Sequence, residues 1–404
     1  MIAFEAAYAR ILDDTAVNGL TETLPLNAAL HRIVAEDQVA QIDVPGYDNS
    51  AMDGYAVCCR EVVANEPLAV SQRITAGDVA AKLSVNSVAR IFTGAMVPQG
   101  ADAIVLQEDS VVDNEGVRFT EPPEPGQHIR RAGQDVGRGS VVVRKGERLT
   151  AAKLGLLASV GVASLACFQP VRVALFSTGD ELVDPGEPLP VGKIYNSNRY
   201  FLTANLRSIG AEVIDLGRCP DSAKATRTFL LEAAAQADFV ITTGGMSVGE
   251  EDYVREQLEA LGEIDFWKIA MKPGKPFAYG RIKGVPFFGL PGNPVSSFVG
   301  FQLLVKPALV KSMGAVDHES KRVVATADFS VQNRGKRMDF IRAVAMGDDN
   351  GEWRVAPYSN QSSGVMSSIV HSNVLLPVAP GAALNPGDRC EAIVLSAEEF
   401  FSFT

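Results

Sequence analysis

The sequence predicts a multidomain protein of mixed α/β and β structure, in which one domain contains a doubly wound, mostly parallel sheet. Three observations lead to this prediction. Four apolar, strand-like runs alternate with helical segments between residues 171 and 316, and two other regions, 46–139 and 317–404, contain short β-branched runs separated by Gly, Pro and Asn. The length of 404 residues corresponds to two to four domains at about 150 residues each.

The amino-terminal region is predicted to be partly helical. Apolar residues recur at helical spacing over residues 4–17 and 25–32, before the chain becomes extended towards residue 45. A second helical stretch begins after Thr150, which is suited to be its N-cap, and Gly161 is expected to end it. Residues 1–45 and 140–170 therefore form one region that flanks the rest of the amino-terminal half.

Two regions are predicted to consist of strands. Residues 46–139 form a β-rich insertion between the two flanking segments, since their β-branched runs are short and interrupted by turn residues. Residues 317–404 have the same texture and are expected to form a small β-barrel or sandwich.

The domain at residues 171–316 is expected to alternate strands and helices in order. Each strand is a short apolar run, and each helix starts near a polar residue and ends near Gly or a turn. The predicted strands begin near residues 172, 211, 238 and 284, and the predicted helices cover 197–210, 222–236, 252–262 and 294–313. This alternation predicts parallel strands joined by crossover helices.

The charge balance argues against a general nucleic-acid or anionic-membrane binder. Lys and Arg number 37 against 48 Asp and Glu, so the net charge is −11, and the long-range field repels polyanions. With 47% apolar and 21% charged residues, the chain has too much core material for a disordered protein.

The cysteine pattern and the amino terminus predict a cytoplasmic protein. Five scattered cysteines without a CxxC pair are typical of free thiols in a reducing compartment. The first residues carry acidic charge at helical spacing and lack the basic and apolar segments of a signal peptide. The uncharged stretch 154–171 contains Gly, Ser, Gln and Pro, which favours a helix followed by a strand over a membrane span.

Two loops of unusual composition follow strands of the predicted sheet, where ligands of doubly wound sheets bind. Thr178, Gly179 and Glu181 follow the first strand, which can present a hydroxyl, a glycine and an acid at one edge. The last strand is followed by Pro291, Gly292, Asn293 and Pro294, a well-defined helix start with free N–H groups. A solvated helix start and an ordinary Asn-Pro N-cap are the alternative interpretations.

A third loop combines glycines with acidic residues. Gly244, Gly245 and Ser247 follow a strand, and Asp252 stands at the start of the next helix. Glycine N–H groups can approach a phosphate, and carboxylates beside such a cradle suit a divalent cation. A tight turn followed by acids that stabilise a helix N-terminus explains the loop equally well.

A basic cluster lies between these loops. Residues 268–283 contain the five cations Lys268, Lys272, Lys275, Arg281 and Lys283 and no acid. A local cluster of this kind suits a small polyanionic ligand, although a solvated charged face is the commoner origin of such runs. The insertion also contains polar loops, around Asp53, Thr93, Arg130 and Asp135. Residue chemistry alone assigns them no function, and successive Asx turns explain the first loop.

Seven motifs in order and spacing resemble one enzyme family. They are DNSAMDGYA, IFTGAMVPQGADAIV, RRAGQDV, STGDEL, TTGGMSVGEEDY, WKIAMKPGKPFAYG and LPGNPVSSF. Together they resemble the molybdopterin molybdenumtransferase family, the MoeA family, which also includes the gephyrin E domain. The resemblance extends from about residue 5 to 400 and is far more specific than any single motif.

The resemblance implies an activity and an assembly. The expected reaction is the insertion of molybdate into adenylylated molybdopterin, with Mg²⁺-dependent hydrolysis of the adenylyl group and release of AMP. The family's α/β domain is MogA-like, and its members are elongated homodimers in which residues such as 1–45 and 140–170 serve as the linker and dimerisation region. The insertion of one subunit faces the α/β cleft of the other, and a separate molybdopterin adenylyltransferase is the expected upstream partner.

The motif matches also imply site residues. In the insertion they are Asp53, Thr93, Arg130 and Asp135, and in the α/β domain they are Glu181, Asp221, Asp252, Lys268, Lys272, Lys275, Pro291 and Pro294. Asp252 and Glu181 are the predicted metal-site residues, with Glu181 also a candidate for contact with the pterin. The three lysines are expected to neutralise phosphate or molybdate, and backbone groups of Gly244, Gly245 and Ser247 and of the helix start at Asn293 to bind phosphate.

The sequence departs from the family pattern at a few positions, which leaves the preferred oxyanion open, and two alternatives to the transferase activity also stay open. Met246 stands in the Gly-Gly loop, and Ala132 takes the third position of the usual run of three arginines. His371 follows the carboxyl-terminal motif, which covers residues 362–368. These residues flank the charged groups and do not replace them. The alternatives are a tungstate-specific paralogue for the oxyanion, and a molybdopterin adenylyltransferase or a gephyrin-like scaffold for the activity.

Overall fold

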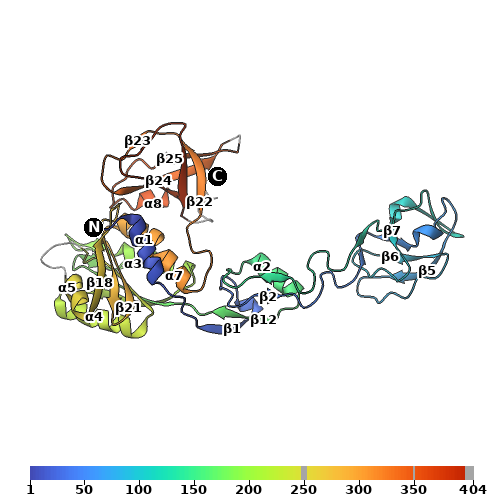
Figure 1. Cartoon of the computed structure of the whole chain (residues 1–404), viewed down its shortest axis with the longest axis horizontal. Helices are drawn as coiled ribbons and strands as arrows, with labels where there is room; N and C mark the ends of the chain where they lie inside the picture. The colour runs from blue at the N-terminus through green and yellow to red at the C-terminus, as the bar shows by residue number, and fades with distance from the viewer. Residues whose placement is uncertain (247–252, 349–350, 396–404) are drawn as a thin grey trace.

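The computed structural model describes residues 1–246, 253–348 and 351–395. The molecule is elongated: an α/β domain and a β-barrel lie together at one end, a narrow linker forms the middle, and a β-rich insertion forms the far end (Figure 1). The predicted fold class, α/β plus β, is confirmed.

The α/β domain is built on a six-stranded sheet in the order β16-β13-β17-β21-β20-β18. The first four strands are parallel, whereas β20 runs antiparallel to both of its neighbours. The strands are β13 (Arg172–Thr178), β16 (Glu212–Cys219), β17 (Phe239–Thr243), β18 (Gly262–Lys268), β20 (Pro276–Ile282) and β21 (Val285–Leu290). The four parallel strands are those expected from the sequence: β13, β17 and most of β21 are buried apolar runs, whereas the edge strand β16 is only partly buried.

Helices cover this sheet and complete its core. They are α1 (Phe4–Asp14), α3 (Ser197–Ser208), α4 (Ala223–Gln236), α5 (Tyr253–Leu261), α6 (Pro294–Gly300) and α7 (Lys306–Ser312). A π-helical stretch, Phe301–Val305, joins α6 to α7 where the sequence predicted one continuous helix. Helix α1 packs here rather than in the linker, because its buried residues Ala7 and Ile11 join the same apolar cluster as Val173 and Ile241.

The antiparallel pair β18 and β20 was not predicted. Residues Gly262 to Phe266 of β18 alternate between half-buried and exposed positions, and the pair with its connection contains most of the basic cluster that the sequence suggested only as a source of charge. The pair extends the sheet beyond β21. Its register places Lys268, at the end of β18, opposite Pro276, at the start of β20.

The linker consists of two short antiparallel pairs and one helix. Its elements are β1 (Thr21–Pro25), β2 (Gln38–Val39), β11 (Val141–Val143), α2 (Ala151–Ser159) and β12 (Ser164–Phe168). Thr150 caps α2 as predicted, since its side chain accepts a hydrogen bond from the N–H of Lys153. The helix predicted over 25–32 is wrong: only a 3-10 turn, Leu26–Ala28, is present, because Pro25 ends a strand that pairs with β12.

The insertion is a four-stranded sheet in the order β5-β6-β4-β7 with short flanking pairs. Its strands are β3 (Asn49–Ser50), β4 (Gly54–Val57), β5 (Ala69–Ile74), β6 (Ser87–Ile91), β7 (Ala103–Leu106), β8 (Ser110–Asp113), β9 (Gly116–Phe119) and β10 (Ile129–Arg130). Two small apolar clusters form its own core.

The carboxyl-terminal domain is a closed barrel in the order β24-β25-β22-β28-β26, because β26 also pairs with β24. Its elements are β22 (Arg322–Ala327), β23 (Val331–Gln332), β24 (Met338–Gly347), β25 (Trp353–Pro357), α8 (Ser367–Val370), β26 (Val374–Val378), β27 (Ala383–Leu384) and β28 (Arg389–Val394). The short strand β19 (Met271–Lys272) of the α/β domain pairs with β24 and so joins the two domains.

Candidate active site

A cavity of about 800 Å³ lies at the carboxyl edge of the parallel strands. The loops after β13, β17 and β21 line it, together with the start of α3, the short strands β14 (Leu182–Val183) and β15 (Ile194–Tyr195), and two residues of the barrel domain. Ten residues predicted for the site line this cavity: Thr178, Gly179, Glu181, Asp221, Gly244, Gly245, Pro291, Gly292, Asn293 and Pro294. Such an edge is where ligands of doubly wound sheets bind.

The Gly-Gly loop lies directly against the end of β13. Gly244 has a φ of +91°, and a Cβ atom at this position would lie 2.4 Å from the carbonyl oxygen of Thr178. Only glycine permits this close approach, which holds the backbone of the loop at the cavity wall. Ser247 and Asp252, which the sequence placed in the same loop and at the next helix start, lie outside the described residues.

Two carboxylates also line the cavity, Glu181 and Asp221. Asp221 Oδ2 accepts a hydrogen bond from the N–H of Asp180 at 2.9 Å, which ties the loop after β13 to the loop after β16. Glu181 folds over Gly179, where a Cβ atom would lie 2.5 Å from Glu181 Oε2. Among the described residues, none forms a hydrogen bond or ion pair with the Glu181 carboxylate, so its charge is directed to solvent and the cavity.

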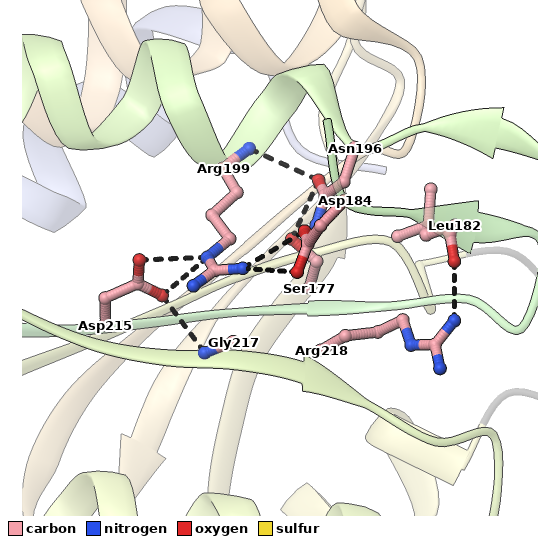
Figure 2. A network of polar contacts seen from close by, with 8 residues as sticks. All are labelled: Ser177, Leu182, Asp184, Asn196, Arg199, Asp215, Gly217 and Arg218. Atoms are coloured by element: carbon pink, nitrogen blue, oxygen red, sulfur yellow. Dashed lines mark hydrogen bonds and ion pairs between the residues drawn. The ribbon is translucent and has the colours of Figure 1, made fainter. Parts of the chain in front are cut away.

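A network around Arg199 holds the segment that carries Glu181 (Figure 2). The guanidinium of Arg199 lies between two carboxylates: its Nε donates to Asp215 at 2.7 and 2.9 Å, and its Nη1 donates to Asp184 at 3.1 Å. Arg218 Nη1 donates to the carbonyl oxygen of Leu182 at 2.5 Å. Both arginines thus attach the segment around β14 to strand β16 and helix α3.

The acceptor Asp215 is placed by an irregularity in β16. One extra residue, Leu216, interrupts the register with β13, and Gly217 adopts a φ of +81°. Asp215 Oδ1 accepts a hydrogen bond from the N–H of Gly217 at 3.0 Å, which fixes the carboxylate that receives Arg199. Asn196, the N-cap of α3, adds a further tie, because its Oδ1 accepts from Ser177 Oγ and from the N–H of Arg199.

The start of α6 forms the third wall. The helix begins at Pro294 as predicted, but the Asn293 side chain makes no cap hydrogen bond. The N–H of Val295 instead donates to the carbonyl oxygen of Ser363 in the barrel domain at 3.1 Å. The barrel therefore satisfies one of the free N–H groups of this helix.

The three predicted lysines do not line the cavity. Lys272 forms an ion pair with Asp339 of the barrel domain, with Nζ and Oδ2 2.8 Å apart, and the two residues are register partners in the pairing of β19 with β24. Lys275 is exposed and precedes Pro276, which does line the cavity. Lys268 ends β18 and is half-buried. Their predicted contact with phosphate or molybdate stays a prediction.

The barrel domain contributes cavity residues that the sequence analysis missed, namely Gly364 and Met366. Arg342 on β24 holds their loop: its Nη2 donates to the carbonyl oxygen of Ser362 and its Nε to Ser368 Oγ, both at 3.2 Å. Arg342 is 1% exposed, and burial lowers the pKa of its guanidinium. The signal available in the sequence was the motif around Ser362, whose contact with α6 only the fold reveals.

Asp53, Thr93 and Arg130 belong to the insertion, which forms the far end of the molecule from the α/β domain, whereas Asp135 lies where the insertion meets the linker, next to Val136, which packs against Val160 (Figure 1). Asp53 Oδ1 accepts hydrogen bonds from the N–H and the Oγ1 of Thr93 at 2.7 and 2.8 Å, and the backbone bond above all lowers the pKa of this carboxyl. Arg130 on β10 is exposed, and the N–H of Asp135 donates to the carbonyl oxygen of Val44. One chain therefore does not bring these four residues to the cavity.

Comparison with known proteins identifies the family. Three family models match in order: the MoeA N-terminal region (domains I and II) at residues 2–161, the probable molybdopterin binding domain at residues 174–311, and the MoeA C-terminal region (domain IV) at residues 324–395. The molybdopterin molybdenumtransferase of Haemophilus influenzae is 41% identical over 379 residues, covering 93% of this chain and 94% of the relative. The chain belongs to the molybdopterin molybdenumtransferase family.

Further relatives support this membership. The molybdopterin molybdenumtransferase of Bacillus subtilis is 34% identical and covers 94% of this chain and 91% of its own length. A crystal structure of a molybdopterin biosynthesis MoeA protein from Pyrococcus horikoshii matches with a TM-score of 0.82 and 32% identity, covering 98% of this chain and all of that one. The protein is accordingly a transferase of molybdenum cofactor biosynthesis. No helix in the described part of the chain is long and apolar enough to cross a membrane.

Proposed function

We propose that this member of the family inserts molybdate into adenylylated molybdopterin and releases AMP. In the coupled hydrolysis, the P–O bond of the pyrophosphate breaks, water supplies a hydroxyl to one phosphorus, and AMP leaves with the displaced oxygen. The observation that carries the proposal is the cavity of about 800 Å³, which a glycine loop and two carboxylates line at the carboxyl edge of the sheet. A volume of this order suits a ligand of nucleotide size.

The glycine loop and the α6 start are proposed to bind the phosphates. The close approach of Gly244 to Thr178 leaves its backbone at the cavity wall without a side chain in between. The N–H of Gly244 itself donates to the carbonyl oxygen of Leu290, so the N–H groups that follow Gly244 in the loop, and those that follow Val295 at the helix start, are the ones proposed to attract the anion. Lys268, Lys272 and Lys275 are proposed to add positive charge at the rim, with Lys272 shared between the ligand and Asp339.

Mg²⁺ is the proposed metal, and the residues present fit it. Glu181 and Asp221 line the cavity, and Mg²⁺ needs only one or two carboxylates in addition to substrate phosphates and water. The described residues contain no group of three or more His, Cys, Asp or Glu side chains that could hold a metal by themselves. Glu181 is proposed to hold the ion together with Asp252, which lies outside the described residues, and Asp221 is available in the same cavity; the ion would neutralise charge that develops on the phosphates.

A homodimer is proposed to complete the site. Asp53, Thr93, Arg130 and Asp135 lie on the insertion, which the linker separates from the cavity of the same chain (Figure 1). An insertion that reaches the cavity of a second copy would place these residues on the molybdate or metal side. The substrate already carries an adenylyl group, which an enzyme that consumes a nucleoside triphosphate must supply. A molybdopterin adenylyltransferase is therefore the proposed upstream partner.

The protein is proposed to act in the cytoplasm, without a nucleic-acid or membrane partner.

A single-turnover assay tests the proposed function. Purified protein is mixed with adenylylated molybdopterin, Mg²⁺ and molybdate, and both AMP and molybdenum cofactor are quantified. We expect AMP release that depends on molybdate and matches cofactor formation in amount. Preference for tungstate would identify a tungstate-specific paralogue, ATP consumption with free molybdopterin would identify an adenylyltransferase, and ligand binding without either product would favour a scaffold.

Removal of the Arg199 side chain is expected to lower the rate of AMP release about 10-fold, because Asp184 and Asp215 then lose the cation that ties the Glu181 segment to β16. Arg172→Ala is the matched control. Arg172 pairs with Asp238 at 2.8 Å in the same sheet, at the opposite end of β13 from the cavity. The single-turnover rates and melting temperatures of Arg199→Ala and Arg172→Ala are compared, and only Arg199→Ala is expected to show the lower rate. Arg199→Lys should recover part of the lost rate. Equal rates for Arg199→Ala and Arg172→Ala would refute the positioning role.

A further inference from the structure

Three buried polar atoms of the cavity wall have no partner within the described part of the chain: Thr178 Oγ1, Asn196 Nδ2 and Asn198 Oδ1. Their residues are 5%, 2% and 7% exposed, and all three line the cavity. Burial of an unpaired hydrogen-bonding group is unfavourable, so an unpaired cluster at a cavity wall points to a ligand that completes it.

The bonded atoms of the two amides fix their orientation. Asn198 Nδ2 lies 2.7 Å from Thr243 Oγ1 and 2.8 Å from the carbonyl oxygen of Gly292, and a carbonyl oxygen only accepts. Asn196 Oδ1 lies 3.4 Å from the N–H of Arg199, which only donates. The atoms left over are therefore a donor at Asn196 and an acceptor at Asn198.

A donor and an acceptor together restrict what can bind. A phosphate or another oxyanion offers only acceptors and would leave Asn198 Oδ1 unpaired, whereas a metal ion would leave Asn196 Nδ2 unpaired. The edge of an amino-oxo-pyrimidine or an aminopurine ring carries donors and acceptors side by side and pairs with both. Leu182, Ile194, Met246 and Met366 also line the cavity, and such side chains pack well against the faces of planar rings.

We propose that Asn196 and Asn198 recognise the edge of the substrate's heterocycle, with Thr178 Oγ1 as a third, adaptable partner. This inference rests on the proposed function, because it assigns one part of adenylylated molybdopterin to one wall of the cavity. Pterin and adenine share the chemistry that the pair recognises.

Asn196→Asp and Asn196→Ser test the proposal. Both variants retain an oxygen that can cap α3 at the N–H of Arg199, and both lack the Nδ2 donor. The Ser variant introduces no charge, and Ser222→Asp is the control for charge in the Asp variant. Ser222 caps the neighbouring helix α4, is exposed and follows Asp221, but it does not line the cavity.

We expect both Asn196 variants to raise the half-saturating concentration of adenylylated molybdopterin in single turnover roughly 10-fold or more, with melting temperatures near that of the wild type. Ser222→Asp should behave as the wild type. Unchanged half-saturation in both Asn196 variants would overturn the inference and leave the proposed function intact, since the wild type would still form product.

Calorimetric titrations with AMP, 6-hydroxymethylpterin and ribose 5-phosphate distinguish the two rings and do not depend on turnover. If the Asn196 variants bind AMP more weakly than the wild type does but bind the pterin equally well, the pair contacts adenine. If they bind only the pterin more weakly, the pair contacts the pterin. If they lose affinity for ribose 5-phosphate as much as for AMP, the pair binds the sugar phosphate, which contradicts the proposal. If the wild type forms no product, the proposed function fails, while these titrations still decide whether the pair binds a ring.

Discussion

Glu181→Gln is expected to lower AMP release and cofactor formation together by about 100-fold or more, while the protein stays folded. The Glu181 carboxylate is exposed at the cavity rim, and it forms no hydrogen bond or ion pair with any described residue. Gln keeps the shape of the side chain over Gly179 but removes the charge that would hold a cation beside the phosphates. Since no internal contact is lost, the free energy of unfolding should change by less than about 0.5 kcal/mol.

Glu187→Gln is the control for this prediction. Glu187 lies six residues further along the chain, between β14 and β15, and is exposed, but it does not line the cavity. Its activity should equal that of the wild type. If Glu181 holds the metal, Mn²⁺ binding followed by electron paramagnetic resonance should weaken in Glu181→Gln and not in Glu187→Gln. Full activity of Glu181→Gln would remove Glu181 from the metal site.

The parallel part of the fold could be predicted because most of its strands are continuous apolar runs that alternate with helical segments. Phe239–Thr243 is buried along its whole length and is followed by two glycines. The β18 and β20 pair was missed because Gly262–Lys268 alternates half-buried and exposed residues up to Phe266 and carries charge, which resembles a polar loop. Position in sequence also misassigned α1, whose apolar face finds its partner more than 150 residues away.

The sequence also predicted much of the cavity wall, since Thr178, Glu181 and the Gly-Gly loop each follow a parallel strand. It could not predict the contributions that depend on packing between domains. Arg342 holds a barrel loop against α6, and neither its burial nor the contact between Ser363 and Val295 has a local signature. The orientation of the Asn198 amide also depends on a residue distant in sequence, because its Nδ2 donates to the carbonyl oxygen of Gly292, 94 residues away in the same domain.

Mixing two inactive variants is expected to restore activity if the site lies across a dimer. Asp53→Ala alters the insertion and removes the acceptor of Thr93, whereas Glu181→Gln alters the cavity. Each variant should be inactive by itself. In a mixed dimer, one composite site carries both substitutions, and the other combines an intact insertion with an intact cavity. Random pairing makes half of the dimers mixed, each with one working site, so activity should return to about a quarter of the wild type.

The distance between the two residue sets makes this outcome diagnostic. The insertion and the cavity lie at opposite ends of one chain (Figure 1), so Asp53 cannot act on the cavity of its own subunit without a rearrangement of the linker. Pairs β1–β12 and β2–β11 hold the two passages of the chain through that linker together. If sites were confined to single chains, every subunit in the mixture would carry one damaged site and no activity would return. The mixture of Asp53→Ala with Thr93→Ala is the matched control, because both substitutions lie in the insertion and no pairing of these chains can build an intact site.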